Sequence, residues 1–202
     1  MSKSRLEAFT DGVIAIIITI LVLTLQPPKK ADLAALLGLS HSFFVYVISF
    51  LTLAVYWNNH HHMFQASKTV SGKILWWNIL FLFCISLLPF ATEWLGDHLM
   101  SRTPQIAYGT LMLATDIVWM FLTRALLRAH KRENTVLKSI EGSKKSTYSI
   151  GAILCGLAAG WFWPPAVMIG CLLSLTPWIV PYRRIERQMQ EKQSEHIDAG
   201  GK

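Results

Sequence analysis

The sequence predicts an all-α membrane protein with six transmembrane helices, and three observations support this fold class. Hydrophobic residues make up 52% of the 202 residues and charged residues only 15%, whereas soluble domains average about 25% charged residues. The mean hydropathy is +0.39. Six apolar segments, separated by turn residues, approach the roughly 17–25 residues that a helix needs to cross a bilayer.

Proline and glycine mark the ends of these segments. The dipeptide Pro27-Pro28 ends the first, residues 96–104 separate the third from the fourth, and Trp163-Pro164-Pro165 makes a tight turn between the fifth and sixth. The fifth and sixth apolar segments are short, and the alternative to spanning the membrane is that they lie in its interface. We expect a transmembrane domain over residues 1–182 and a basic tail over 183–202, with spans near 8–26, 42–59, 74–95, 105–124, 147–163 and 165–182.

The basic start of the chain resembles a secretory signal, because Lys3 and Arg5 precede an apolar stretch. Asp11 interrupts the start of that stretch, however, and no small-x-small cleavage site follows it. We therefore expect the first helix to be retained.

The chain has a net charge of +7, and its lysines and arginines lie mainly on one side of the expected membrane. Sixteen of its 19 lysines and arginines fall on the side of the N-terminus, and only Lys29, Lys30 and Arg102 fall on the other. This asymmetry places both termini in the cytoplasm. We expect the lipid bilayer to be the partner of this basic surface, with some affinity for anionic lipid headgroups. The positive charge does not indicate binding to nucleic acid.

Several function classes lack their signatures. Cys84, Cys155 and Cys171 each lie in an apolar segment without a CxxC pair, so neither a disulfide framework nor a zinc site is indicated. No GxSxG, HExxH or Walker-type motif suggests an enzyme. The consecutive histidines 60–62 point in different directions on a helix, which disfavours a metal or haem site, and we expect no cofactor.

Polar residues from three spans meet at one depth, near the cytoplasmic boundary. Arg5 and Asp11 are six positions apart, about 120° around a helix, so they cannot pair along one face. We expect His, Trp or Asn side chains of spans two and three, or a neighbouring subunit, to pair with Asp11, because an unpaired ionisable group is costly there. The polar residues of those two spans are Asn58, His60, His61, Trp77 and Asn78.

Two interpretations of this network stay open. It can pin three helices together, or it can gate or sense protons, because histidine titrates near neutral pH. Asp116 in the fourth span can be a second pairing site or a pathway residue, and its neighbours Thr115 and Trp119 favour helix packing.

The first span carries one stripe of aliphatic residues with a single hydroxyl, in which 4,3,4,3 spacing aligns Gly12, Ile16, Thr19, Leu23 and Gln26, with Ile20 at its edge. The stripe can be ordinary packing or a pore face, in which aliphatic rings exclude water and Thr19 replaces part of an ion's hydration shell. No TVGYG-like segment occurs, so no P-loop filter is expected. In the fifth span, Gly156 and Gly160 form a small-xxx-small packing face.

Three motifs carry a family resemblance. The segment from Arg5 through Phe9-Thr10-Asp11-Gly12 resembles the RxxxFSDG signature of the transmembrane protein 175 family, with Thr10 in place of the usual Ser. The stretches from Trp57 to His61 and from Trp77-Asn78 to Leu88-Pro89-Phe90 are also similar to that family. The resemblance covers all six helices in layout, and its specific motifs lie in the first three.

The resemblance implies a potassium-permeable channel whose first helix lines the pore. Counted from Asp11, the constriction falls on Ile16, the hydroxyl layer on Thr19, and further rings on Ile20 and Leu23. Arg5, Phe9 and Asp11 match the signature's structural network. A single six-helix repeat implies a prokaryotic homotetramer in the bacterial inner membrane, with potassium as the permeant ion and no other protein partner.

Two alternatives remain beside this leak-type channel. One is a proton leak or a proton-coupled transporter that uses Asp11, Asp116 and the histidine cluster. The other is a non-conducting membrane scaffold or a haem-binding subunit.

Overall fold

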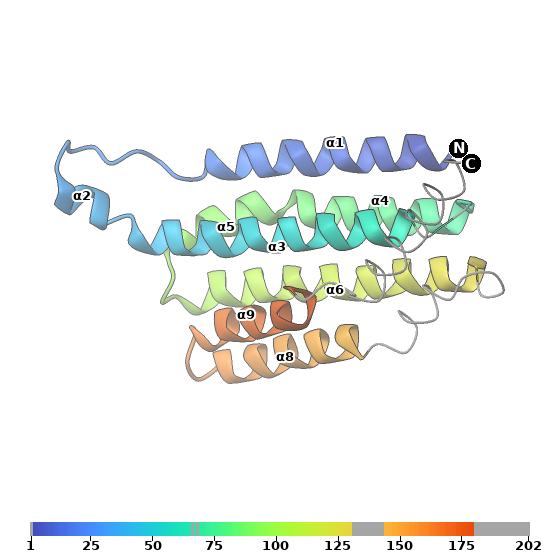
Figure 1. Cartoon of the computed structure of the whole chain (residues 1–202). Helices are drawn as coiled ribbons and strands as arrows, with labels where there is room; N and C mark the ends of the chain where they lie inside the picture. The colour runs from blue at the N-terminus through green and yellow to red at the C-terminus, as the bar shows by residue number, and fades with distance from the viewer. Residues whose placement is uncertain (1, 66, 68, 131–143, 180–202) are drawn as a thin grey trace, which may run out of the picture.

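The computed structural model describes residues 2–65, 67, 69–130 and 144–179, and over these residues the chain is an all-helical bundle without strands (Figure 1). The all-α class is therefore confirmed. The expected tail, 183–202, and most of the linker before the fifth span lie outside the described residues. The helices are α1 (Lys3–Val22), α2 (Leu33–Leu37), α3 (Ser40–Gln65), α4 (Gly72–Ser86), α5 (Leu88–Asp97), α6 (Arg102–His130), α8 (Lys145–Gly160) and α9 (Ala166–Ile179).

The long helices run alternately up and down, with α1 along one edge of the bundle and α8 and α9 along the other (Figure 1). Helix α1 packs against α3, α4 and α5, and α6 packs against α4, α5 and α8. The α8–α9 hairpin is the most intimate helix pair. Because the rest of the bundle lies on one side of α1, the opposite face of α1 is left uncovered.

The third expected span consists of two helices rather than one. Helix α4 ends at Ser86 and α5 begins at Leu88, with Pro89 in the first turn of α5. Proline has no N–H for the carbonyl four residues earlier, Ile85, and its ring clashes with that carbonyl. The break therefore follows from Pro89, and the two helices together form one apolar stretch of 26 residues, Gly72–Asp97.

The first span ends earlier than expected, at Val22 rather than near residue 26. The N–H groups of Leu23, Thr24 and Leu25 each donate to the carbonyl three residues earlier, so the last turn tightens. The residue before a proline is biased away from helical conformation, which acts here on Gln26. The expectation that Gln26 continues the helical stripe is therefore wrong.

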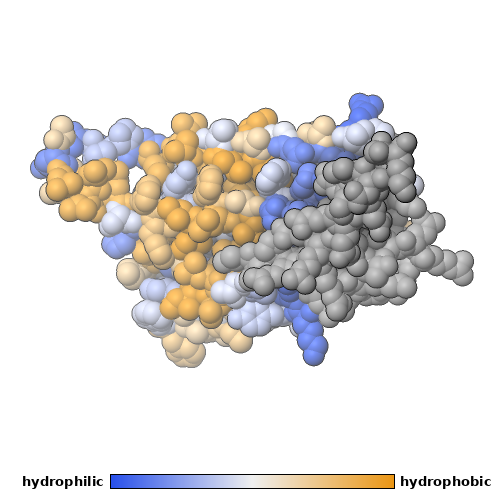
Figure 2. All heavy atoms as spheres, in the orientation of Figure 1, coloured by the Kyte–Doolittle hydropathy of each residue, from blue (hydrophilic) through white to orange (hydrophobic). Residues whose placement is uncertain are grey.

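Among the described residues, three stretches are long and apolar enough to cross a membrane, namely Ser40–Gln65, Gly72–Asp97 and Arg102–Ala129. Helix α1 has 20 residues, about 30 Å at 1.5 Å per residue, but it carries Lys3, Arg5, Glu7 and Asp11. Helices α8 and α9 have 16 and 14 residues, about 24 and 21 Å, which is less than the roughly 30 Å hydrocarbon core. Figure 2 shows hydrophobic side chains gathered over the middle of the bundle.

Glycine permits the close approach of α8 and α9. A Cβ atom on Gly156 would lie 2.9 Å from the Cα of Gly170 in α9, closer than real Cβ contacts allow. Gly160 faces the side chain of Val167 in the same way. By contrast, a Cβ on Gly151, also in α8, would meet nothing within 4 Å.

We expect Gly156→Ala to lower the thermal unfolding midpoint of the protein in detergent, because overpacking a close contact costs roughly 1–3 kcal/mol. Gly151→Ala is the matched control, and it should keep or raise the midpoint, because alanine exceeds glycine in helix propensity by about 0.8–1.0 kcal/mol. Equal midpoints for the two variants would mean that α8 and α9 are not held this closely.

Candidate functional site

Helix α1 has one buried face and one uncovered face. The buried face holds Leu6, Thr10, Ile14, Ile17 and Leu21. The uncovered face holds the expected stripe: the side chain of Ile16 is 59% exposed, that of Ile20 is 45% exposed and that of Leu23 is 69% exposed. Gly12 and Thr19 are exposed as well, whereas Gln26 lies beyond the end of α1. A single chain therefore leaves a continuous aliphatic face of α1 without a protein neighbour.

Thr19 adds one polar atom to this face. Its hydroxyl donates to the carbonyl oxygen of Ile16 at 2.7 Å, so the hydroxyl hydrogen is used within the helix. A hydroxyl oxygen that donates its hydrogen keeps its acceptor lone pairs. The uncovered face thus presents an acceptor oxygen between the exposed side chains of Ile16 and Leu23.

Behind this face, a buried hydrogen-bond chain joins α1, α4 and α3. Asn78 Nδ2 donates to Thr10 Oγ1 at 2.8 Å, and Asn78 Oδ1 lies 2.9 Å from His60 Nε2. Since an amide oxygen only accepts, His60 Nε2 carries the hydrogen. All three side chains are at most 1% exposed. Three of the expected network residues are thus brought together across three helices.

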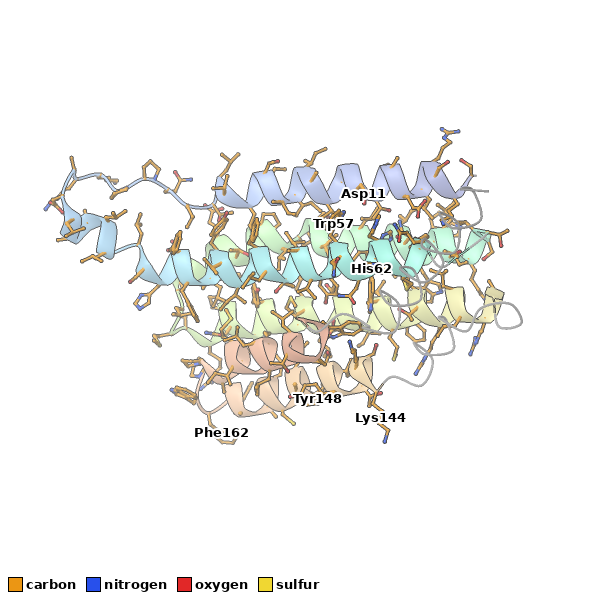
Figure 3. The ribbon with its side chains drawn as sticks, viewed as in Figure 1. Asp11, Trp57, His62, Lys144, Tyr148 and Phe162 are labelled. Carbon is orange, nitrogen blue, oxygen red and sulfur yellow. The ribbon has the colours of Figure 1, made fainter. Side chains whose placement is uncertain are left out.

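Asp11 belongs to a second, more open cluster beside the first. Trp57 Nε1 of α3 donates to Asp11 Oδ1 at 3.0 Å, and Figure 3 shows the two side chains between α1 and α3. The expectation that a Trp, His or Asn of span two or three pairs with Asp11 is confirmed for this contact. The rings of Trp57 and His61 stack with their centroids 5.9 Å apart. On the same ring, His61 Nε2 accepts a hydrogen bond from Gln65 Nε2 at 2.7 Å.

The remaining network residues lie elsewhere. Arg5 and Phe9 are exposed, and they continue the uncovered face of α1, because positions 5, 9, 12, 16, 19 and 23 repeat the 4,3 spacing. Asn58 is half-buried, and Trp77 stacks on Phe121 of α6 with ring centroids 4.9 Å apart. The spacing that found the stripe could also have assigned Arg5 and Phe9 to it.

The three consecutive histidines diverge, as their spacing predicts. His60 faces Asn78, whereas His61 lies against Trp57. The Nδ1 atom of His62 is buried without a hydrogen-bond partner in the described part of the chain. Across these same ranges, no three His, Cys, Asp or Glu side chains are grouped so that they could hold a metal ion.

Asp116 of α6 pairs with α3. It is 5% exposed, and Tyr56 OH donates to its Oδ1 at 2.5 Å. Its other oxygen, Oδ2, has no hydrogen-bond partner among the described residues. A further buried contact, which the sequence did not reveal, links Thr92, Ser49 and Tyr108 through their hydroxyls at 2.7 and 3.0 Å.

Comparisons with known proteins point to one family. A family model described as "Endosomal/lysosomal potassium channel TMEM175" matches residues 5–89, which include most of α1 and both polar clusters. A protein named as a potassium channel from Chryseobacterium sp. (strain P1-3) is 38% identical over 191 residues, 95% of this chain and 100% of that protein. The rat protein (Rattus norvegicus) named "Endosomal/lysosomal proton channel TMEM175" is 30% identical over 152 residues, 66% of this chain and 30% of that protein.

A solved structure is similar in fold. It is a crystal structure described as a lysosomal potassium-selective channel TMEM175 homolog from Chamaesiphon minutus. The two structures agree with a TM-score of 0.73 at 28% sequence identity, over 88% of this chain and 94% of that one.

Proposed function

The chain belongs to the TMEM175 family, and from this membership we propose that it forms a potassium-permeable, leak-type cation channel of the bacterial inner membrane. Its relatives in this family are named as ion channels rather than enzymes. The observation that carries the proposal is the uncovered aliphatic face of α1, with the acceptor oxygen of Thr19 set into it.

We propose that four copies of the chain surround one axis with their α1 helices innermost. This arrangement covers the face that one chain leaves open, and the exposed Arg5 and Phe9 would then meet neighbouring subunits. Residues 1–182 form the channel domain, in which α4 and α5 together make one of six spans. The short α8 and α9 cross with the help of local bilayer thinning.

The N-terminal end of the bundle faces the cytoplasm in this proposal. Support comes from charge, because most basic residues of the described chain lie near the end of the bundle where α1 and α4 begin and α6 ends (Figure 1). At the opposite end, Lys29 and Lys30 follow α1 and Arg102 begins α6. An excess of Lys and Arg marks the cytoplasmic side. The residues at the cytoplasmic end are Lys3, Arg5, Lys73, Arg124, Arg128, Lys144 and Lys145.

Ions are then selected by dehydration rather than by a carbonyl filter. Rings of Ile16, Ile20 and Leu23 form a narrow apolar passage, and such a passage resists wetting. The oxygen of Thr19 from each subunit replaces part of the hydration shell at that level. Sodium is more tightly hydrated than potassium and therefore loses more hydration free energy on entering the passage. This difference favours the permeation of potassium.

The test is ion flux from proteoliposomes under opposed potassium and sodium gradients. We expect wild type to pass potassium in preference to sodium, and Thr19→Ala to lose about fivefold of that discrimination, equivalent to about 1 kcal/mol. Thr24→Ala is the matched control, because its hydroxyl also donates to a carbonyl three residues earlier, at 2.8 Å, but off the stripe. Equal discrimination in Thr19→Ala and wild type would remove Thr19 from the ion path.

A second candidate function is proton permeation, which the name of the rat relative and the buried carboxyl of Asp116 favour. The same vesicles with a trapped pH dye measure it. Proton flux that persists in Ile16 variants and disappears in Asp116→Asn would replace the potassium channel by a proton pathway. Absence of all flux would favour the scaffold, and a Soret band in the purified protein would favour the haem-binding subunit.

A further inference from the structure

A basic hollow of about 510 Å³ opens between the beginning of α4 and the last turns of α6. Residues of α6 spaced three and four apart form one wall, and the first turns of α4 form the other. The hollow lies away from the uncovered stripe of α1, so the proposed ion pathway does not use it. Its lining residues are Ser71, Lys73, Trp77, Phe121, Arg124, Ala125, Arg128 and Ala129.

The rim of the hollow is cationic. Lys73, Arg124 and Arg128 all line it, and all three side chains are exposed. No Asp or Glu of the described chain lines it. Two arginines and a lysine on one small surface repel each other unless an anion lies between them, and guanidinium groups bind phosphate in bidentate fashion.

The backbone of α4 adds to this positive potential. Helix α4 starts at Gly72, and its N-cap residue Ser71 accepts a hydrogen bond from the N–H of Ile74. The N–H groups of a first helical turn point out of the helix, and the helix dipole makes this end favourable for an anion. The three cationic side chains and the start of α4 thus surround one place.

The floor of the hollow is aromatic. Trp77 and Phe121 stack with ring centroids 4.9 Å apart and an interplanar angle of 16°, and the guanidinium carbon of Arg124 lies 6.0 Å from the centre of the Phe121 ring. Trp77 lies one turn deeper along α4 than Lys73, and Phe121 lies one turn deeper along α6 than Arg124. The hollow is therefore charged near the end of the bundle and apolar toward its middle.

We propose that this hollow binds an anionic phospholipid, with its phosphate between Lys73, Arg124 and Arg128 and the start of an acyl chain against Trp77 and Phe121. A free phosphate would use the rim alone, whereas the change from cationic rim to aromatic floor along the membrane normal matches a lipid. The site rests on the proposed function only for its assignment to the cytoplasmic leaflet.

The test is lipid binding to the purified protein in detergent. Binding is measured as the rise in the thermal unfolding midpoint while phosphatidylglycerol is titrated in. Phosphatidylcholine and inorganic phosphate are the two comparison ligands. We expect phosphatidylglycerol alone to stabilise wild type, and Arg124→Gln/Arg128→Gln to weaken its apparent affinity by about tenfold or more, as expected for lost charge-assisted hydrogen bonds. Lys73→Gln should weaken it in the same direction, so the test does not depend on the double variant folding.

Lys144→Gln is the matched control, because Lys144 is an exposed cation directly before α8, outside the hollow (Figure 3). It should bind phosphatidylglycerol as wild type does. Equal affinity in the hollow variants and in Lys144→Gln would overturn the site. Equal stabilisation by inorganic phosphate would also overturn it, because the ligand would then be a soluble anion. Ion flux plays no part in this readout, so the lipid site and the channel can fail separately.

Discussion

Ile16→Asn is expected to raise potassium flux through reconstituted protein by about tenfold, equivalent to lowering the barrier by about 1.4 kcal/mol, and to reduce the preference for potassium over sodium. Ile16 is 59% exposed on the uncovered face of α1, so the change removes little packing within one chain. In the proposed tetramer, four asparagine amides around the axis replace four branched aliphatic side chains, so water can enter the passage. Ions crossing a water-filled passage shed less of their hydration shell.

The control for this variant is Val22→Asn. Val22 lies on the same helix and is 48% exposed, but at 100° per residue it is about 120° around the helix from Ile16. Both proteins are compared by flux at equal protein-to-lipid ratios. Unchanged flux in Ile16→Asn, or the same increase in Val22→Asn, would mean that position 16 does not line the passage.

The uncovered face of α1 could be predicted from sequence because helical periodicity alone determines which side chains share a face. Ile16, Thr19 and Leu23 are exposed together, as their 3,4 spacing requires. Arg5 and Phe9 obey the same spacing, and the resemblance matches both to the signature's structural network. Their exposure in a single chain follows from this periodicity, and the structural network that the resemblance implies for them stays a prediction.

The contacts between helices were less accessible to sequence. Their expected depth in the membrane places Asp11, His60 and Asn78 at one level near the cytoplasmic boundary. Which atom meets which depends on how α1, α3 and α4 are rotated and how closely they approach, and neither quantity is contained in any one helix. Asn78 therefore turned out to bond to Thr10 and His60, while Asp11 bonds to Trp57.

Local chemistry was sufficient for some boundaries. Pro89 separates α4 from α5 by a rule that needs no tertiary information, so that break was predictable, although a single span was expected. The hydrogen bond between Tyr56 and Asp116 could not be predicted in this way, because those residues are 60 positions apart in the sequence. Hydroxyl contacts such as Ser49 with Tyr108 leave no periodic signal either.

Asn78→Leu is expected to produce the largest loss of stability among single changes in the polar clusters. Leucine keeps most of the volume but removes both hydrogen bonds of a side chain that is 0% exposed. Thr10 Oγ1 and His60 Nε2–H are then left buried without that partner, at roughly 1–3 kcal/mol for each unsatisfied group. The thermal unfolding midpoint in detergent should fall accordingly, whereas Asn58→Leu, at a half-buried position, should change it little.

A second substitution separates lost hydrogen bonds from lost packing. Thr10→Val removes the acceptor that Asn78→Leu leaves unpaired, so the double variant should be less destabilised than the sum of the two single changes. Strict additivity would mean that the Thr10–Asn78 bond does not couple α1 to α4. If Asn78→Leu instead folds as stably as Asn58→Leu, but its potassium flux loses a pH dependence that wild type shows, then the buried chain serves gating rather than assembly.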